Sequence, residues 1–212
     1  MLHDIGRFEQ LTRYGTFADK KSENHGELRV KVLQQGKVLT DLDEATQHLI
    51  LKAISCHNCL HIPEGESPAC TFFSRLLRDA DKLDIFNIAS TYYHINHAER
   101  NAAVELDLPD TPEVSQDVLD CLQAGKMIRM QQLRSLNDFK LLQMAWVYDI
   151  NFPPTFRMVF ERGYLKKIKD MLAASERINQ IYSGLLTYLR EYACYEGRKM
   201  QVSPQVLERS EK

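Results

Sequence analysis

The spacing of the apolar residues constrains this chain most, because it follows the helical period of about 3.6 residues nearly throughout the sequence. For example, Ile50, Ala53, Ile54 and His57 fall on one helical stripe. No segment shows the alternation of apolar and polar residues that predicts a half-buried strand. Nine glycines and seven prolines in 212 residues leave few positions for tight turns. The sequence therefore predicts an all-α fold without internal repeats.

Capping residues and helix breakers place the expected helices along the chain. Ser22 is a candidate N-cap and Gly36 a stop signal, and the clearest break is the proline-containing segment 107–113. Helices are predicted over 22–35, 43–56, 70 to past 93, 126–148, from Pro153-Pro154 onward, and over 175–194. The chain is predicted to be a single domain of 212 residues, with a motif-bearing part over about 1–97 and a C-terminal helical part over about 113–206.

The charge balance argues against partners that bind through bulk electrostatics. The chain has 27 Lys and Arg against 29 Asp and Glu, and its formal net charge is −2. Nothing therefore favours nucleic acid or an anionic membrane, and any phosphate has to be bound locally. No apolar run approaches the roughly 18 residues that cross a bilayer, and the first residues lack the features of a secretion signal. We expect a cytoplasmic protein.

The five cysteines indicate reduced thiols, because their number is odd and a chain of this size does not need disulfides for stability. Cys56 and Cys59 have the spacing of half a zinc site, but no second pair follows at a useful distance. Two ordinary cysteines near a helix end are the favoured interpretation.

Several signatures of enzyme classes are missing from the sequence. It contains no G-x-S-x-G, G-x-x-x-x-G-K-[ST], G-x-G-x-x-G or H-E-x-x-H. Their absence disfavours α/β-hydrolases, P-loop NTPases, dinucleotide-binding enzymes and zincins. Histidines and aspartates at inward-facing helical positions are the remaining candidates for chemistry.

Three such residues follow from helical spacing. His57 shares its stripe with apolar residues, and His25 shares a face with Leu28 and Val32. The segment 75–84 is predicted to turn Leu77, Ala80, Asp81 and Asp84 inward and to solvate Arg75, Arg78, Asp79 and Lys82. An ionised carboxylate facing the core needs a metal ion, a cation or several donors. For Asp81, a buried ion pair and a metal ligand are equally open.

The pair His3-Asp4 adds an imidazole and a carboxylate, which Mn, Fe, Co, Ni and Zn accept as ligands. His3-Asp4-Ile5-Gly6-Arg7 resembles the doublet of the HD-domain metal-dependent phosphohydrolases. Asp79-Ala80-Asp81-Lys82-Leu83-Asp84 resembles the later motif with that family's last metal-binding aspartate. The order makes the resemblance specific, since a single histidine at 25 and His57-Asn58 lie between the two motifs. The resemblance covers about residues 2–97.

This resemblance implies an HD-type helical bundle with additional C-terminal helices and a site for two divalent metal ions. His3 and Asp81 are implied to bind one ion, His25 and His57 the other, and Asp4 to bridge the two. The candidate metals are Mn, Fe, Co, Ni, Zn and Mg. Paired ions lower the pKa of a bridging water and clamp phosphate oxygens during in-line attack. The implied activity is hydrolysis of a phosphate ester in a small substrate, with nucleotides among the candidates.

One departure from the family leaves alternatives open. The family's first histidine lies upstream of the doublet, and only two residues precede the doublet in this sequence. Leu2 and Ile5 are interpreted as the end of an apolar helix, so a truncated chain is expected. The alternatives are an HD-fold protein with two irons that activates oxygen and a non-catalytic HD-fold binding module.

Further residues are predicted to act on the substrate. Arg7, one turn after His3, is placed to bind a phosphate through two hydrogen bonds, although pairing with a carboxylate is equally open. Lys21 and Asn58 are predicted to contact the substrate, Lys21 because it precedes a helix N-terminus that suits an anion. The predicted catalytic residues are Asp4, Arg7 and Lys82, with Lys82 either orienting Asp81 or lying in solvent.

Overall fold

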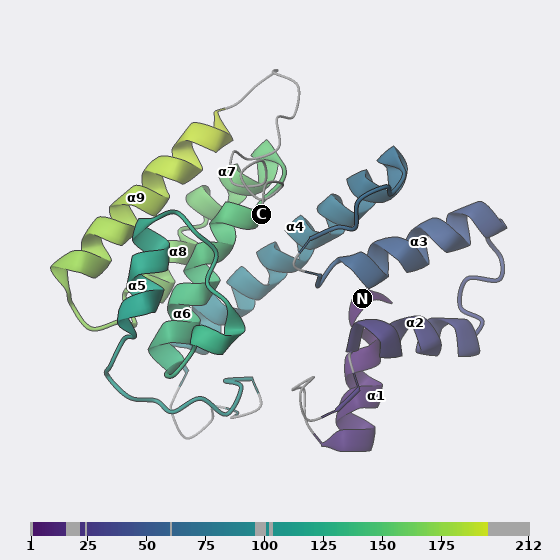
Figure 1. Ribbon diagram of the computed structural model, residues 1–212, viewed down its shortest axis with the longest axis horizontal. Helices are drawn as coiled ribbons and strands as arrows, with labels where there is room; N and C mark the ends of the chain where they lie inside the picture. Colours follow the sequence, from purple (N-terminus) through teal and green to yellow (C-terminus); the bar gives the residue numbers. More distant parts are fainter. Residues whose placement is uncertain are drawn as a thin grey trace. The chain divides into compact units, whose positions relative to one another are not determined.

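The computed structural model describes residues 2–15, 22–23, 25–59, 61–95, 101 and 104–194, with only the backbone of His25. Every regular element within these ranges is a helix or a 3-10 turn (Figure 1), which confirms the predicted all-α class. In this part of the chain, no helix combines the length and the apolarity needed to cross a bilayer.

The chain divides into two compact units. Unit 1 comprises Met1–Asp81 and Asn101–Asp107, and unit 2 comprises Lys82–Arg100 and Leu108–Lys212. The boundary after residue 107 falls at the start of the predicted break, whereas the boundary after residue 81 falls within a helix. That the two units form one domain stays a prediction.

Unit 1 contains η1 (Leu2–Asp4), α1 (Ile5–Tyr14), α2 (His25–Gln35), α3 (Glu44–Cys56) and the first part of α4 (Pro68–Tyr92). Helix α2 packs against both α1 and α3 (Figure 1, purple to blue). Gly15 ends α1 with a φ of 65°, a conformation that favours glycine, and its N–H donates to the Leu11 carbonyl at 2.8 Å. Asp43 caps α3 by accepting a hydrogen bond from the Thr46 N–H at 3.0 Å.

The helices predicted for this half of the chain are confirmed to within a few residues. The predicted 22–35 is α2, 43–56 is α3, and the long helix from residue 70 is α4, which ends at Tyr92. Leu2 lies in η1 and Ile5 begins α1. That these residues end an apolar helix stays a prediction.

Unit 2 contains the second part of α4 and then α5 (Gln116–Gln123), η4 (Met130–Gln132), α6 (Leu136–Ala145), η5 (Trp146–Asp149), α7 (Pro153–Glu161), α8 (Tyr164–Lys169) and α9 (Glu176–Ala193). One continuous apolar cluster forms its core, in which Phe86, Leu141, Met144, Leu185 and Leu189 are fully buried. Each such side chain contributes roughly 1.5–3 kcal/mol through burial, so this cluster is the main source of stability for unit 2.

The predicted helix over 126–148 is wrong, and α5 is a helix that the sequence patterns missed. The structure divides this segment into η4, α6 and η5 because a polar cap fixes where α6 begins. The Ser135 hydroxyl accepts from the Asp138 N–H at 3.1 Å. The buried Asp138 carboxylate accepts from the Ser115 N–H and hydroxyl at 2.8 and 2.7 Å and from the Arg134 N–H at 2.9 Å. These bonds hold the segment before α5 against the start of α6. The capping bonds, two of which come from the distant Ser115, outweigh the helical apolar spacing.

The last two predicted helices are confirmed. Pro153 opens α7, where its missing N–H has no helical partner to lose, and Ser175 is the N-cap position of α9. Gly163, with a φ of 64°, separates α7 from α8.

Candidate metal centre

Three side chains of unit 1 converge on one point. His3 and Asp4 lie in η1, and Asp81 lies on α4. His3 Nε2 lies 2.7 Å from Asp4 Oδ2 and 3.3 Å from Asp81 Oδ1. One ligand atom from each residue lies within 4.8 Å of those of the other two. Ligand atoms at about 2.0–2.2 Å from one metal ion are at most about 4.4 Å apart, so small side-chain movements would fit this group to an ion.

The protonation of these groups follows from their contacts. Hydrogen bonds to Asp4 and Asp81 raise the pKa of His3 from 6.5 to about 9, despite the opposing effect of burial. For Asp4, burial acts to raise the pKa of the carboxyl, but the hydrogen bond from His3 and the charges of His3 and Arg29 outweigh it and lower the pKa. At neutral pH a protonated imidazole therefore lies between two carboxylates. A metal ion that binds these three residues has to displace the His3 proton.

The three side chains differ in their access to solvent. The exposed fraction is 16% for His3 and 22% for Asp81, but 47% for Asp4. Asp4 is therefore the most accessible of the three to solvent.

His57 lies beside this group without being part of it. Its ring contacts the His3 ring edge to face, with 5.4 Å between centroids. The residue is only 6% exposed, as its apolar stripe predicts. Burial, followed by the charge of Arg29, lowers the pKa of His57 to about 4. His57 is therefore neutral at physiological pH.

Arg29 is the residue of this region that the sequence analysis missed. It lies on α2, its side chain is fully buried, and its guanidinium contacts the ring of His57. The sequence offered a signal for its burial, because Arg29 is a charged residue that lies among the apolar residues Leu28 and Leu33 of α2. A charged residue at a position that helical spacing turns inward was also the reason to choose Asp81 as a candidate.

Two predicted site residues fall partly or wholly outside the described residues. His25 begins α2, but nothing is described of its side chain, and Lys21 lies in an undescribed segment. The metal-binding role of His25 and the substrate-binding role of Lys21 stay predictions.

The predicted orientation of α4 around Asp79 is wrong. Arg78, Asp79 and Lys82 are buried, with Asp79 only 1% exposed, whereas Ala80 and Asp84 are exposed. Asp81 nevertheless contacts His3. The predicted role of Asp81 is therefore compatible with the structure, although the solvated face assigned to its neighbours is not.

The contacts of Arg78 explain this orientation. Its guanidinium donates to the main-chain carbonyls of Cys56, His57 and Cys59. These carbonyls lie at the end of α3 and in the turn that follows, where the helix itself supplies no donors, and that of Cys56 also accepts from the Cys59 N–H at 3.2 Å. The side of α4 that is buried here is the side whose arginine finds polar partners. The spacing of apolar residues in the sequence does not predict such partners.

The remaining predicted residues have other contacts. The Lys82 ammonium lies 2.7 Å from Asp149 Oδ2 and is buried, so the expectation that it lies in solvent is wrong. Arg7 donates to Gln10 Oε1 at 3.0 Å. Asn58 is exposed in the turn after α3. The catalytic roles of Lys82 and Arg7 and the substrate contacts of Arg7 and Asn58 stay predictions.

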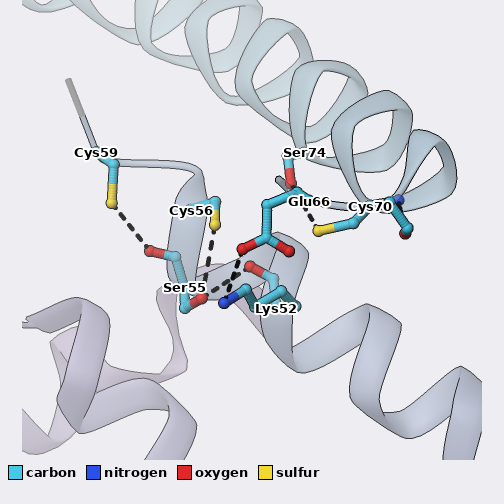
Figure 2. Close-up of polar contacts among 8 residues, drawn as sticks. Lys52, Ser55, Cys56, Cys59, Glu66, Cys70 and Ser74 are labelled. Carbon is cyan, nitrogen blue, oxygen red and sulfur yellow. Dashed lines mark hydrogen bonds and ion pairs between the residues drawn. The ribbon is translucent and has the colours of Figure 1, made fainter. Parts of the chain in front are cut away.

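The five cysteines are all free thiols. Figure 2 shows three of them, with the Cys59 thiol donating to the Ser55 carbonyl at 3.4 Å and Cys70 lying 3.9 Å from the Ser74 hydroxyl. Burial is the main cause that raises the pKa of both Cys59 and Cys70. Both thiols are therefore protonated at neutral pH, and Cys59 serves as a weak hydrogen-bond donor, whereas either group can donate in the contact of Cys70 with Ser74.

Comparison of the chain with protein-family models, with curated proteins and with solved structures found no match. The resemblance to the HD-domain phosphohydrolases therefore depends on the residues of this site and on their order in the sequence.

Proposed function

We propose that this protein is a metal-dependent hydrolase of phosphate esters, with His3, Asp4 and Asp81 as metal ligands. The observation that carries the proposal is the convergence of one imidazole and two carboxylates from segments far apart in the sequence. Imidazole and carboxylate suit divalent transition metals. Their order in the chain, together with His57, is the order found in HD-domain phosphohydrolases.

A divalent ion held by these ligands supplies Lewis acidity and lowers the pKa of a bound water toward neutrality. His3 binds through Nε2 once it has lost its proton. Asp4 is the most exposed ligand, so it lies where water and substrate enter. Arg7 follows one helical turn later and supplies a cation with the geometry to bind phosphate oxygens. The substrate class is a small phosphorylated molecule, with nucleotides among the candidates.

The experiment compares hydrolysis of p-nitrophenyl phosphate and bis(p-nitrophenyl) phosphate before and after Mn²⁺ is added to EDTA-stripped protein. We expect turnover only with Mn²⁺, and we expect Asp81→Asn to reduce it on the order of 100-fold, because one charged ligand is lost. The matched control is Asp84→Asn, an exposed aspartate on the same helix, which should retain full turnover.

Two results would contradict the proposal. The first is wild-type protein that hydrolyses neither ester when Mn²⁺ is bound. The second is Asp81→Asn with the same metal-dependent turnover as Asp84→Asn, which would show that Asp81 is only part of an ion pair.

A further inference from the structure

A cavity in unit 2 is lined by residues of three helices that pack against one another, α7, α8 and α9. Its volume is about 270 Å³. Small-molecule pockets commonly span roughly 300–1,000 Å³, so this cavity suits a small ligand. The residues of the candidate metal centre belong to unit 1, and the cavity is therefore a separate feature of the chain.

Most of the side chains around this cavity are apolar. Val159, Leu165 and Leu189 line it and are buried, and Phe160 and Leu186 line it and are half-buried. Contact with such side chains removes the hydrocarbon of a ligand from water, which is favourable in proportion to the area covered. The cavity therefore favours a ligand with an apolar body.

The charged groups around the cavity share one sign. Lys166 and Arg190 are the charged residues that line it, both are exposed, and no lining residue is acidic. Tyr182 also lines it, and burial raises the pKa of its phenol against the opposing charges of Lys166 and Arg190. The phenol is therefore protonated at neutral pH and can donate a hydrogen bond. Two cations and one O–H donor beside an apolar cavity complement a ligand with one negative charge.

Arg190 is the cation best placed to bind that charge. Its guanidinium lies over the ring of Phe160, 5.0 Å from the ring centroid. Among the residues that the structure describes, no carboxylate pairs with this guanidinium, whereas the Lys166 ammonium already pairs with Asp170 at 2.6 Å. A guanidinium that rests on an aromatic ring still has N–H groups at its edge, and two of them match the two oxygens of a carboxylate.

We propose that this cavity binds a free medium-chain fatty acid, with its hydrocarbon chain among the apolar side chains and its carboxylate on Arg190. A second cavity of about 430 Å³ shares Phe160 and Arg190, but Glu161 lines it as well, so its mixed charge suits an anion less well. The proposal gives unit 2 a binding function of its own, which does not depend on the metal centre in unit 1.

The test is calorimetric titration of the full chain with decanoate. We expect one decanoate to bind per chain. Octanoate should bind more weakly, by about fourfold for each methylene that it lacks, because each buried methylene contributes to binding. Decylammonium has the same chain length and the opposite charge, and we expect it not to bind.

Two variants separate the contributions of charge and of apolar contact. Arg190→Gln should weaken decanoate binding at least about tenfold, because hydrogen bonds to a charged group are lost. Leu186→Asp should abolish binding, since it places a carboxylate among the apolar side chains. Arg177→Gln, which removes an arginine near the start of the same helix, is the matched control and should bind decanoate as the wild type does.

Several results would overturn the proposal. One is decanoate that does not bind below about 1 mM. Others are equal affinities for decanoate and decylammonium, which would indicate apolar contact without a carboxylate site, and wild-type affinity in Arg190→Gln. An affinity that falls as the protein concentration rises would assign the cavity to a second copy of the chain. If circular dichroism shows that Leu186→Asp is unfolded, the exposed position of Arg190 keeps Arg190→Gln decisive.

Discussion

His3 determines how the candidate metal centre responds to pH. Its two carboxylate partners raise its pKa to about 9, so a proton and a metal ion compete for Nε2 throughout the physiological range. Asp4 does not add to this competition near neutrality, because its pKa is lowered and it is already ionised.

We therefore predict that Mn²⁺ binds more tightly as the pH rises. Between about pH 6 and 9 the apparent Kd should fall by about tenfold per pH unit, because one proton is displaced for each ion bound, and it should level off above about pH 9. Calorimetric titration at several pH values measures this slope. His48→Gln, which changes an exposed histidine on α3, should leave the slope unchanged. A Kd independent of pH over this range would contradict a role for protonated His3.

At the residue scale the sequence predicted part of this site. The buried position of His57 followed from helical spacing. The stripe predicted for Asp81 was wrong, because Ala80 and Asp84 on it are exposed, and the pairing of His3 with Asp81 was implied by the family resemblance. Arg29 and Asp79 were not predicted to be buried, since spacing does not show which charged groups find polar partners inside a fold. Burial of a charge depends on three-dimensional contacts between distant segments.

At the scale of elements, the end of α3 depends on a side chain from α4. Arg78 donates to three carbonyls around the turn that follows α3 and thereby positions His57 beside His3. A cation near a helix C-terminus also interacts favourably with the helix dipole.

We predict that Arg78→Met destabilises the protein by about 1–3 kcal/mol, because the carbonyls of His57 and Cys59 lose a donor, whereas that of Cys56 keeps the Cys59 N–H. Urea denaturation followed by circular dichroism measures the change. Arg75→Met, which removes a less buried arginine from the same helix, should cost less than about 0.5 kcal/mol. Equal effects of the two substitutions would show that the carbonyl contacts of Arg78 contribute little.

The elements also show where sequence patterns were sufficient. Helices α2, α3, α7 and α9 were predicted because caps and prolines at their ends agree with their apolar spacing. The segment 126–148 was mispredicted because Asp138, which fixes the start of α6, takes its hydrogen bonds from Ser115 as well as from neighbouring residues. A cap completed by a distant segment leaves no periodic signal in the sequence.

At the scale of the whole molecule, the two units differ in the size of their apolar core. The large apolar cluster lies in unit 2. Among the described residues of unit 1, Leu28, Leu33 and Ile54 are buried beside the polar residues Arg29 and Asp79, and none of them belongs to that cluster. Polar groups contribute less net free energy when buried than apolar ones, so unit 1 is expected to be the less stable unit when no metal ion is bound.

We therefore predict two unfolding transitions on heating in EDTA. Trp146 is the single tryptophan of the chain and packs against the unit 2 core, with 6.2 Å between its ring and that of Phe86. Circular dichroism should detect the loss of helix from unit 1 first, while tryptophan fluorescence should change only in the second transition. Mn²⁺ at about 100 times its Kd stabilises the binding unit by about 2.7 kcal/mol, which should raise the first midpoint by about 10 °C or more and leave the second unchanged. Asp81→Asn should abolish the shift of the first midpoint. A single transition in which both signals coincide, with or without Mn²⁺, would show instead that the two units unfold together.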